Sequence, residues 1–276
     1  MKNKIKRFLH YLYISVKRPE MSVLPGNLAF FFMMMLVPLL TILGIIISNL
    51  DVGKASVYEA LVSNFPNNIA NLIISISGES SNAIGIGSLL VASLILASNG
   101  TYSMIVTSNS IYDVRKYSYI KSKIKSVILV LIFITLLIVL LMIPVITSKV
   151  LGFLESLTKT NAATNIYFWL YKLLKYPVTF LLVFIFVKIL YKFSPTKTRK
   201  KRTSYGAVFT SVLLVIVTWG YSYYIEYFNT YESFYGSISS LLFLMLYLYI
   251  ISYIFVLGMN INYAREKIIE EESKAQ

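Results

Sequence analysis

Long apolar segments separated by shorter polar stretches dominate this sequence. Six of them are close to the roughly 20 residues that a tilted helix needs to cross a ~30 Å hydrocarbon core. They lie at about 26–48, 84–107, 127–147, 176–193, 205–228 and 238–262. Because a helix satisfies its own backbone hydrogen bonds in lipid, the pattern predicts an all-α, polytopic transmembrane helical bundle of about six spans. The limits of the fourth span stay open, since its apolar core is the shortest.

The first 18 residues follow a different pattern. Apolar residues recur there at helical spacing, at Ile5, Phe8, Leu9, Leu12 and Val16. Lysines and arginines fill many of the other positions, as in a basic amphipathic helix on a membrane surface. A secretory signal would need a continuous apolar core and a small-residue cleavage site, so we expect an uncleaved surface helix over 1–18.

The segments between and after the spans complete a single membrane domain, 1–276. The longest connection, 49–83, has apolar residues at helical spacing broken by Pro66. This predicts two short helices resting on the outer leaflet. Residues 264–276 form a charged tail, and no low-complexity linker divides the chain.

Composition agrees with a membrane protein. Hydrophobic residues make up 57% of the chain and charged residues 14%, against about 25% charged in soluble domains. The net charge of +14 would suggest nucleic acid in a soluble protein, but its distribution gives another reason. The N-terminal segment, the loops after spans two and four and the tail hold 20 basic residues, and the alternate loops hold three. This asymmetry predicts a cell (inner) membrane protein with both termini in the cytoplasm, and it requires no nucleic acid.

Some of these basic residues are candidates for contact with anionic lipid head groups. They are Lys172, Lys175, Arg199, Lys200, Lys201 and Arg202. Each basic residue near an anionic surface adds about 1 kcal/mol of attraction. Two alternatives stay open: the run 197–202 can be a topology signal alone, and Lys172 and Lys175 can pair with Glu226 at the outer interface.

A polar path through the bundle has candidates in the first two spans. Pro38 removes the hydrogen bond to the Met34 carbonyl, and a broken or kinked helix at mid-depth is one way to build a substrate site. Span two carries a stripe of small residues that includes Ser103, with Asn99 and Asn109 beside it. The alternatives are that proline is common in membrane helices and that small residues let helices pack closely.

Catalytic chemistry finds no support in the sequence. The chain has no cysteine and one histidine, and its 12 acidic residues are scattered on both sides of the predicted membrane. A metal nuclease or an acid/base pair needs several such groups at one place. We therefore expect no metal, no cofactor and no enzyme activity.

The second half of the chain carries Tyr-x-Phe-x-Pro before a basic loop, a Gly-Ala pair, Tyr-Gly-Ser, and a closing Leu-Gly-x-x-x-Asn. In these features it resembles the YihY/BrkB family of inner-membrane proteins. With SNSIYDVR and Pro38 in the first half, the resemblance covers nearly the whole chain. The family positions are Tyr112, Tyr191, Pro195, Gly206, Tyr235, Gly236, Gly258, Asn260 and Asn262.

The resemblance implies a six-helix membrane protein of unsettled activity. The family was long labelled ribonuclease BN, a name now regarded as misassigned, and some members are suspected of moving lipids. This chain has Asn260 where the family usually has a glutamate, and Met35 where it has a serine. A proton-coupled role for that glutamate is therefore not expected here.

The leading hypothesis is a multi-pass transporter or lipid translocator of unknown substrate. The alternative is a non-catalytic structural or partner-binding membrane protein that serves envelope integrity. A water-accessible cavity beside Pro38, Asn99 and Asn109 would favour the first, and a dry bundle would favour the second. The ribonuclease label is the least favoured.

Overall fold

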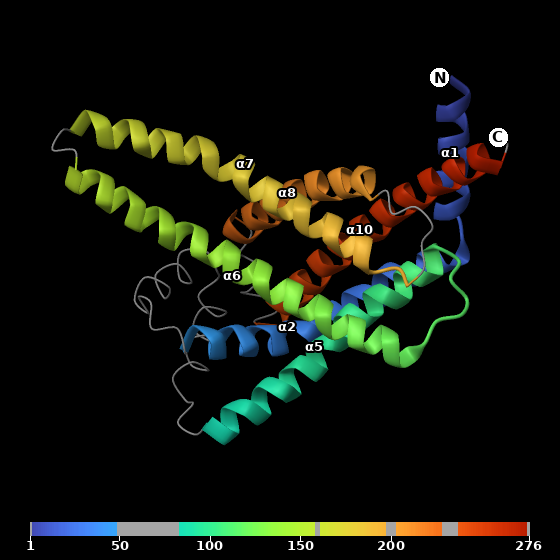
Figure 1. Ribbon diagram of the computed structural model, residues 1–276, viewed down its shortest axis with the longest axis horizontal. Helices are drawn as coiled ribbons and strands as arrows, with labels where there is room; N and C mark the ends of the chain where they lie inside the picture. Colours follow the sequence, from blue (N-terminus) through green and yellow to red (C-terminus); the bar gives the residue numbers. More distant parts are fainter. Residues whose placement is uncertain (1, 49–82, 158–160, 197–202, 228–236, 275–276) are drawn as a thin grey trace. The chain divides into compact units, whose positions relative to one another are not determined.

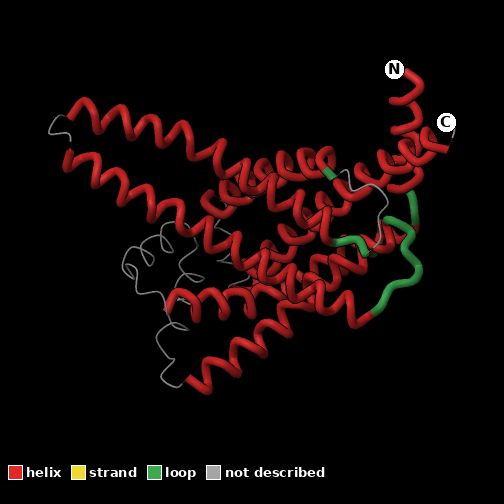
Figure 2. Tube along the Cα trace, viewed as in Figure 1, coloured by secondary structure: helices red, strands yellow, loops and turns green. Residues whose placement is uncertain are grey.

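The computed structural model describes residues 2–48, 83–157, 161–196, 203–227 and 237–274. Within these ranges all regular elements are helices, which confirms the predicted all-α class (Figures 1 and 2). The elements are α1 (Lys2–Val16), η1 (Pro19–Ser22), α2 (Leu24–Ser48), α5 (Ala83–Ile111), α6 (Tyr119–Leu157), α7 (Asn161–Phe193), α8 (Ser204–Tyr227) and α10 (Ser237–Lys274). The surface helices predicted for 49–83 fall almost entirely outside the described residues.

Five segments of the described chain are long and apolar enough to cross a membrane. They are Pro19–Ile46, Gly87–Ile111, Tyr119–Val139, Ser204–Tyr224 and Leu241–Lys274. They correspond to the predicted spans one, two, three, five and six. The predicted span four lies in α7, whose side chains are described only from Pro177 onward, so it stays a prediction.

Two helices extend well beyond the predicted spans. The third span was expected over 127–147, whereas α6 runs through 39 residues. The residues predicted as a charged tail, 264–276, are mostly helical, because α10 continues to Lys274. At 1.5 Å per residue the 38-residue α10 is about 57 Å long, more than the hydrocarbon thickness. Hydropathy marks only the part of a helix that suits lipid, and the Glu270–Lys274 ion pair, at 3.1 Å, supports the rest.

The chain divides into two compact units. One comprises 1–35, 98–129 and 183–276, and the other comprises 36–97 and 130–182. The side chains described as buried in the second unit are mainly aliphatic, with Leu39, Ile42 and Leu43 among the most enclosed. The first unit combines an apolar core with many buried hydroxyl and amide groups. The polar side chains of the candidate site therefore belong to the first unit.

Glycines let helices of the first unit approach closely. α8 packs along α10, and a Cβ atom added to Gly206 would collide with the Gly258 carbonyl oxygen. A Cβ added to Gly258 would collide with Thr210 and Tyr191. On α5, a Cβ on Gly100 would lie only 2.7 Å from the Met35 sulfur. These small residues thus mark helix contacts, as such residues do in membrane bundles.

The N-terminal helix forms over nearly the predicted range and packs beside the C-terminal part of α10 (Figure 1). Tyr11 OH donates a hydrogen bond to a Glu271 carboxylate oxygen near the end of α10. The opposite side of α1 leaves Leu9 and Tyr13 more than half exposed. The predicted contact of α1 with the membrane surface stays a prediction, and α10 is an additional partner within the protein.

Pro38 does not break its helix. α2 is continuous from Leu24 to Ser48, with the proline inside it and buried. Thr41 Oγ1 donates to the Val37 carbonyl oxygen at 2.9 Å in the turn that follows. A proline removes one backbone hydrogen bond, and neighbouring hydroxyl groups can stabilise the helix around it. The helix is therefore not broken at Pro38, and a kink at this point stays a prediction.

Candidate functional site

Three distant segments of the first unit meet at Arg18, which lies between α1 and η1. Its guanidinium forms a fork with the Asp113 carboxylate, Nη1 to Oδ1 at 3.0 Å and Nη2 to Oδ2 at 3.2 Å. Nη2 also donates to Tyr263 OH on α10 at 3.0 Å, and that hydroxyl donates to Asp113 Oδ2 at 2.7 Å. Two parallel N–H···O bonds fix both distance and orientation. The cluster ties the beginning of the chain to the end of α5 and to the C-terminal half of α10.

Asp113 adopts a backbone conformation that usually belongs to glycine. Its φ of 56° places it in the left-handed region just after the end of α5. Val114 N–H bonds to the Asn109 carbonyl at 2.8 Å, and Asp113 N–H bonds to the Ser110 carbonyl at 3.3 Å. This pair of bonds is the Schellman ending of a helix. An aspartate at this position aims its carboxylate at Arg18 and Tyr263, which a glycine could not do.

The charge state of Asp113 follows from these contacts. Partial burial by itself raises the pKa of the carboxyl group, but the hydrogen bonds from Tyr263 and Arg18 and the positive charges of Arg18 and Lys267 together outweigh it, and the net pKa is lowered. The group is therefore a carboxylate at neutral pH. The Arg18–Asp113 pair carries no net charge.

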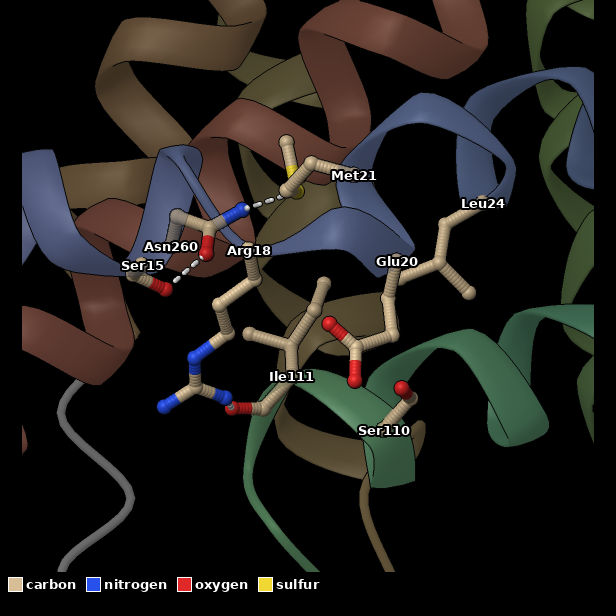
Figure 3. Close-up of a pocket in the computed structure, with 8 residues that line it drawn as sticks. All are labelled: Ser15, Arg18, Glu20, Met21, Leu24, Ser110, Ile111 and Asn260. Carbon is tan, nitrogen blue, oxygen red and sulfur yellow. Dashed lines mark hydrogen bonds between the residues drawn. The ribbon is translucent and has the colours of Figure 1, made fainter.

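A small pocket of about 10 Å³, with room for one group the size of a water molecule, opens beside this cluster (Figure 3). Its lining residues are Ser15, Arg18, Glu20, Met21, Leu24, Ser110, Ile111 and Asn260. Asn260, where the resembled family usually has glutamate, is buried and held on all sides. Its Oδ1 accepts from Ser15 Oγ, and its Nδ2 donates to the Val256 carbonyl at 2.8 Å and to the Met21 sulfur at 3.2 Å. A neutral amide in this setting positions its neighbours, and it does not titrate as a glutamate would.

Buried polar groups continue along α5. Asn109 Oδ1 accepts two hydrogen bonds at 2.8 Å, from the backbone N–H and the hydroxyl of Thr196. Thr101 Oγ1 donates to the Ser126 carbonyl of α6 at 2.7 Å. Other buried polar atoms have no hydrogen-bond partner among the described residues. On α5 these are Ser103 Oγ, Thr107 Oγ1, Ser108 Oγ and Asn109 Nδ2.

Several of the family-motif positions form joints between helices. Tyr191 is fully buried, donates to the Phe255 carbonyl at 2.8 Å and lies 2.6 Å from Thr210 Oγ1. Asn262 Oδ1 accepts from Gly206 N–H at 2.8 Å, which fastens α10 to the start of α8. The Pro195 carbonyl accepts from Lys125 Nζ at 2.9 Å.

Tyr112, another motif position, belongs to the Arg18 cluster. Its ring packs edge-on against the Tyr263 ring, with 5.8 Å between centroids. Burial raises the pKa of the Tyr112 hydroxyl, so this group stays protonated at neutral pH. It supports the cluster by packing.

The residues predicted for a polar path separate into two groups. Ser103 and Asn109 lie on the buried side of α5. Asn99 is exposed and accepts a hydrogen bond from Lys123 Nζ at 2.6 Å, so this amide has a partner on α6. Met34 is also exposed, at 61%. A cavity shared by Pro38 and Asn99 stays a prediction.

Other predicted residues cannot be placed. Tyr235, Gly236, Arg199, Lys200, Lys201 and Arg202 lie outside the described residues. Lys172 and Lys175 belong to α7, in the part whose side chains are not described. The proposed lipid contacts of these lysines and arginines stay predictions.

Sequence reasoning missed the cluster itself. Arg18 counts only as one charge in the topology signal, and Tyr263 lies just past the sixth predicted span, 238–262. Asp113 was noted only among scattered carboxylates, although it stands inside the SNSIYDVR motif directly after a predicted span. A charged residue at a helix end, where glycine is usual, was the available signal.

Comparison with known proteins identifies relatives over nearly the whole chain. The sequence pattern of the family described as "Virulence factor BrkB" matches residues 13–276. A protein of Bacillus subtilis (strain 168) named "Putative ribonuclease-like protein YfkH" is 27% identical over 272 residues, which cover 96% of this chain and 98% of the relative. No solved structure matches the chain.

Proposed function

This chain belongs to the BrkB family, and from that premise we propose that it is a membrane transporter or lipid translocator. The observation that carries the proposal is the set of unpartnered buried polar groups on α5. We further propose that it acts in the cytoplasmic membrane with both termini in the cytoplasm, where its basic loops meet anionic lipid.

The physical argument concerns solvation. A buried hydroxyl or amide without a partner destabilises a protein by about 1–3 kcal/mol, so native structures keep few of them. Ser103 and Thr107 are one helical turn apart on α5, and both are fully or almost fully buried. Groups left in this state are suited to a passing polar solute or to water that accompanies it. The presence of these unpartnered hydroxyl groups on a helix that also carries hydrogen-bonded polar groups supports a path for a polar solute along α5.

Two threonines of α5 provide a matched test. Valine has nearly the shape of threonine but no hydroxyl. Thr107→Val removes a group without a described partner, so it should leave the free energy of unfolding unchanged or raise it. Thr101→Val removes the bond to the Ser126 carbonyl and should lower the free energy of unfolding by about 1 kcal/mol.

The functional measurement is lipid movement between leaflets. Purified protein is placed in vesicles that contain a head-group-labelled phospholipid, and an impermeant quencher reports how fast label becomes accessible. Wild type should exceed protein-free vesicles, and Thr107→Val should be slower than wild type despite its full stability. Wild-type vesicles no faster than empty ones, or a Thr107→Val protein as fast as wild type, would contradict the proposal.

A second candidate function is structural, and the glycine contacts favour it. Gly206 and Gly258 bring α8 and α10 together without room for a side chain, which is typical of a rigid scaffold. In that case the protein would hold a partner or support the envelope, and the vesicle assay would show no movement for any variant.

We do not propose ribonuclease activity, although the relative YfkH has a ribonuclease-like name. Hydrolysis of a phosphodiester by metal ions uses several carboxylates or histidines at one point. Among the described residues no three His, Cys, Asp or Glu side chains are grouped in that way. The proposal therefore includes no enzyme activity, no cofactor and no nucleic-acid partner.

A further inference from the structure

The pocket beside Arg18 has one charge that is not balanced within it. Arg18 makes four hydrogen bonds through its two terminal nitrogens, to both Asp113 oxygens, to Tyr263 OH and to the Ile111 carbonyl. A guanidinium has five N–H donors, so almost all of its capacity is used. Asp113 also cancels its charge. The Glu20 carboxylate, which has no ion pair or hydrogen bond among the described side chains, therefore decides the electrostatics of the pocket.

The remaining polar groups of the pocket favour a ligand that donates hydrogen bonds. Both N–H groups of the Asn260 amide are used within the protein, and Ser15 Oγ donates to Asn260 Oδ1, which leaves lone pairs on the serine oxygen. Ser110 adds a half-buried hydroxyl, and Figure 3 draws it on the same side of the pocket as the Glu20 carboxylate. A carboxylate with one hydroxyl on its side of the pocket and another across the pocket suits a primary ammonium, which carries three N–H donors.

The position of the pocket at the start of a membrane span indicates what kind of ligand it binds. Glu20 is the second residue of the membrane span Pro19–Ile46, so its carboxylate lies where the span begins. From there an exposed apolar face runs from Val23 (65% exposed), the residue before α2, to Phe30 (52%) and Met34 (61%) on α2. These residues share one side of the helix, at steps of seven and four. A ligand held at Glu20 thus has an apolar surface beside it, suited to acyl chains.

We propose that this pocket binds the primary ammonium of an ethanolamine-type phospholipid, with Glu20 as its charged partner and the exposed face of α2 along its acyl chains. The inference deepens the proposed function by naming a lipid class. Phosphatidylcholine is the informative comparison, because it has the same net charge and the same phosphate. Its quaternary ammonium is larger and has no N–H to donate, so it cannot use the acceptors of the pocket.

The test is a binding competition, separate from any transport assay. The protein is placed in lipid nanodiscs with equal amounts of phosphatidylethanolamine, phosphatidylcholine and phosphatidylglycerol, and the lipids retained on it are counted by native mass spectrometry. Wild type should retain phosphatidylethanolamine over phosphatidylcholine by about three- to tenfold, a range suited to one partly exposed charged contact. Glu20→Gln should lose this preference, and Glu20→Asp should keep part of it. Glu270→Gln, which removes a carboxylate of α10 outside the pocket, should match wild type.

Three outcomes would overturn the inference. They are equal retention of the two zwitterionic lipids by wild type, an unchanged preference in Glu20→Gln, and preferential retention of phosphatidylglycerol that Glu20→Gln leaves unaltered. Soluble phosphoethanolamine should not displace the lipid at equal concentration, and displacement would contradict the role of the α2 face. If the protein prefers phosphatidylethanolamine but moves no lipid between leaflets, only the proposed function is refuted. If it moves lipid but shows no preference for phosphatidylethanolamine, only the proposed pocket is refuted.

Discussion

Asp113 combines a backbone strain with a charge interaction, and three substitutions separate the two. Its φ of 56° is unfavourable for most residues, is free of strain for glycine, and is tolerated by asparagine and aspartate. Asp113→Ala keeps the strain and loses the carboxylate. Asp113→Gly removes both, and Asp113→Asn keeps a tolerant side chain that can still accept from Tyr263 but has no charge.

The magnitudes follow from the geometry. A non-glycine residue without a local side-chain hydrogen bond loses about 1 kcal/mol in the left-handed region. The fork to Arg18 is well aligned, but the Arg18 and Asp113 side chains are 27% and 51% exposed, so solvent screens it. We assign to it the upper part of the surface range, about 0.5–1 kcal/mol. Glycine should therefore be about 1 kcal/mol more stable than alanine, while glycine and asparagine, which both lack the fork, should each lie about 0.5–1 kcal/mol below wild type.

Unfolding in detergent micelles, followed by circular dichroism over a range of pH, measures these differences. Because the pKa of Asp113 is lowered in the folded protein, the charge contribution is complete above the ordinary value of 3.8 and is lost as pH falls through the lower folded value. The gap between wild type and Asp113→Asn should stay constant from about pH 5 to 8 and narrow below about pH 4. If the Asp113→Ala protein is as stable as the Asp113→Gly protein or more stable, residue 113 does not have a left-handed backbone conformation in the folded protein.

Three further predictions concern topology, activity and access. Reporter domains fused after Lys125 and after Arg202 should both lie in the cytoplasm, since the basic residues gather in those loops, and an outside signal from either would break the six-span scheme. Purified protein with divalent metals should show no nuclease activity above that of an empty-vector preparation carried through the same purification. A single cysteine at Asn99 in this cysteine-free chain should react with small water-soluble thiol reagents while one at Leu131 does not, and equal protection at both would favour a packed bundle.

Hydropathy predicted the fold well because lipid imposes one strong rule on the chain. Each predicted span that the described side chains test falls inside a helix, and the N-terminal amphipathic pattern corresponds to α1. The helix ends were less predictable. α10 continues beyond the apolar region because its charged residues are good helix formers and α1 packs against it. Neither the helix propensity of charged residues nor the packing of α1 on α10 can be read from a hydropathy profile.

The Arg18 cluster could not be predicted from the sequence, for a different reason. Arg18 lies 95 residues from Asp113 and 245 from Tyr263, so only tertiary structure brings them together. Pattern reasoning judges each residue by its neighbours in sequence. It could find Asp113 as a polar residue after a helix, but not the guanidinium that makes this aspartate preferable to glycine.

The stripe of small residues in span two shows how the structure changes the meaning of a sequence pattern. On sequence alone, packing and a polar path were alternatives for the whole stripe. In the structure, Gly100 contacts α2 so closely that packing accounts for it, and the Thr101 hydroxyl is used by α6. Further along the same helix, Ser103 and Thr107 are equally buried, yet their hydroxyls have no partner among the described residues. One stripe therefore serves both roles in different turns, and the hydroxyls that packing does not explain are the ones to remove when transport is tested.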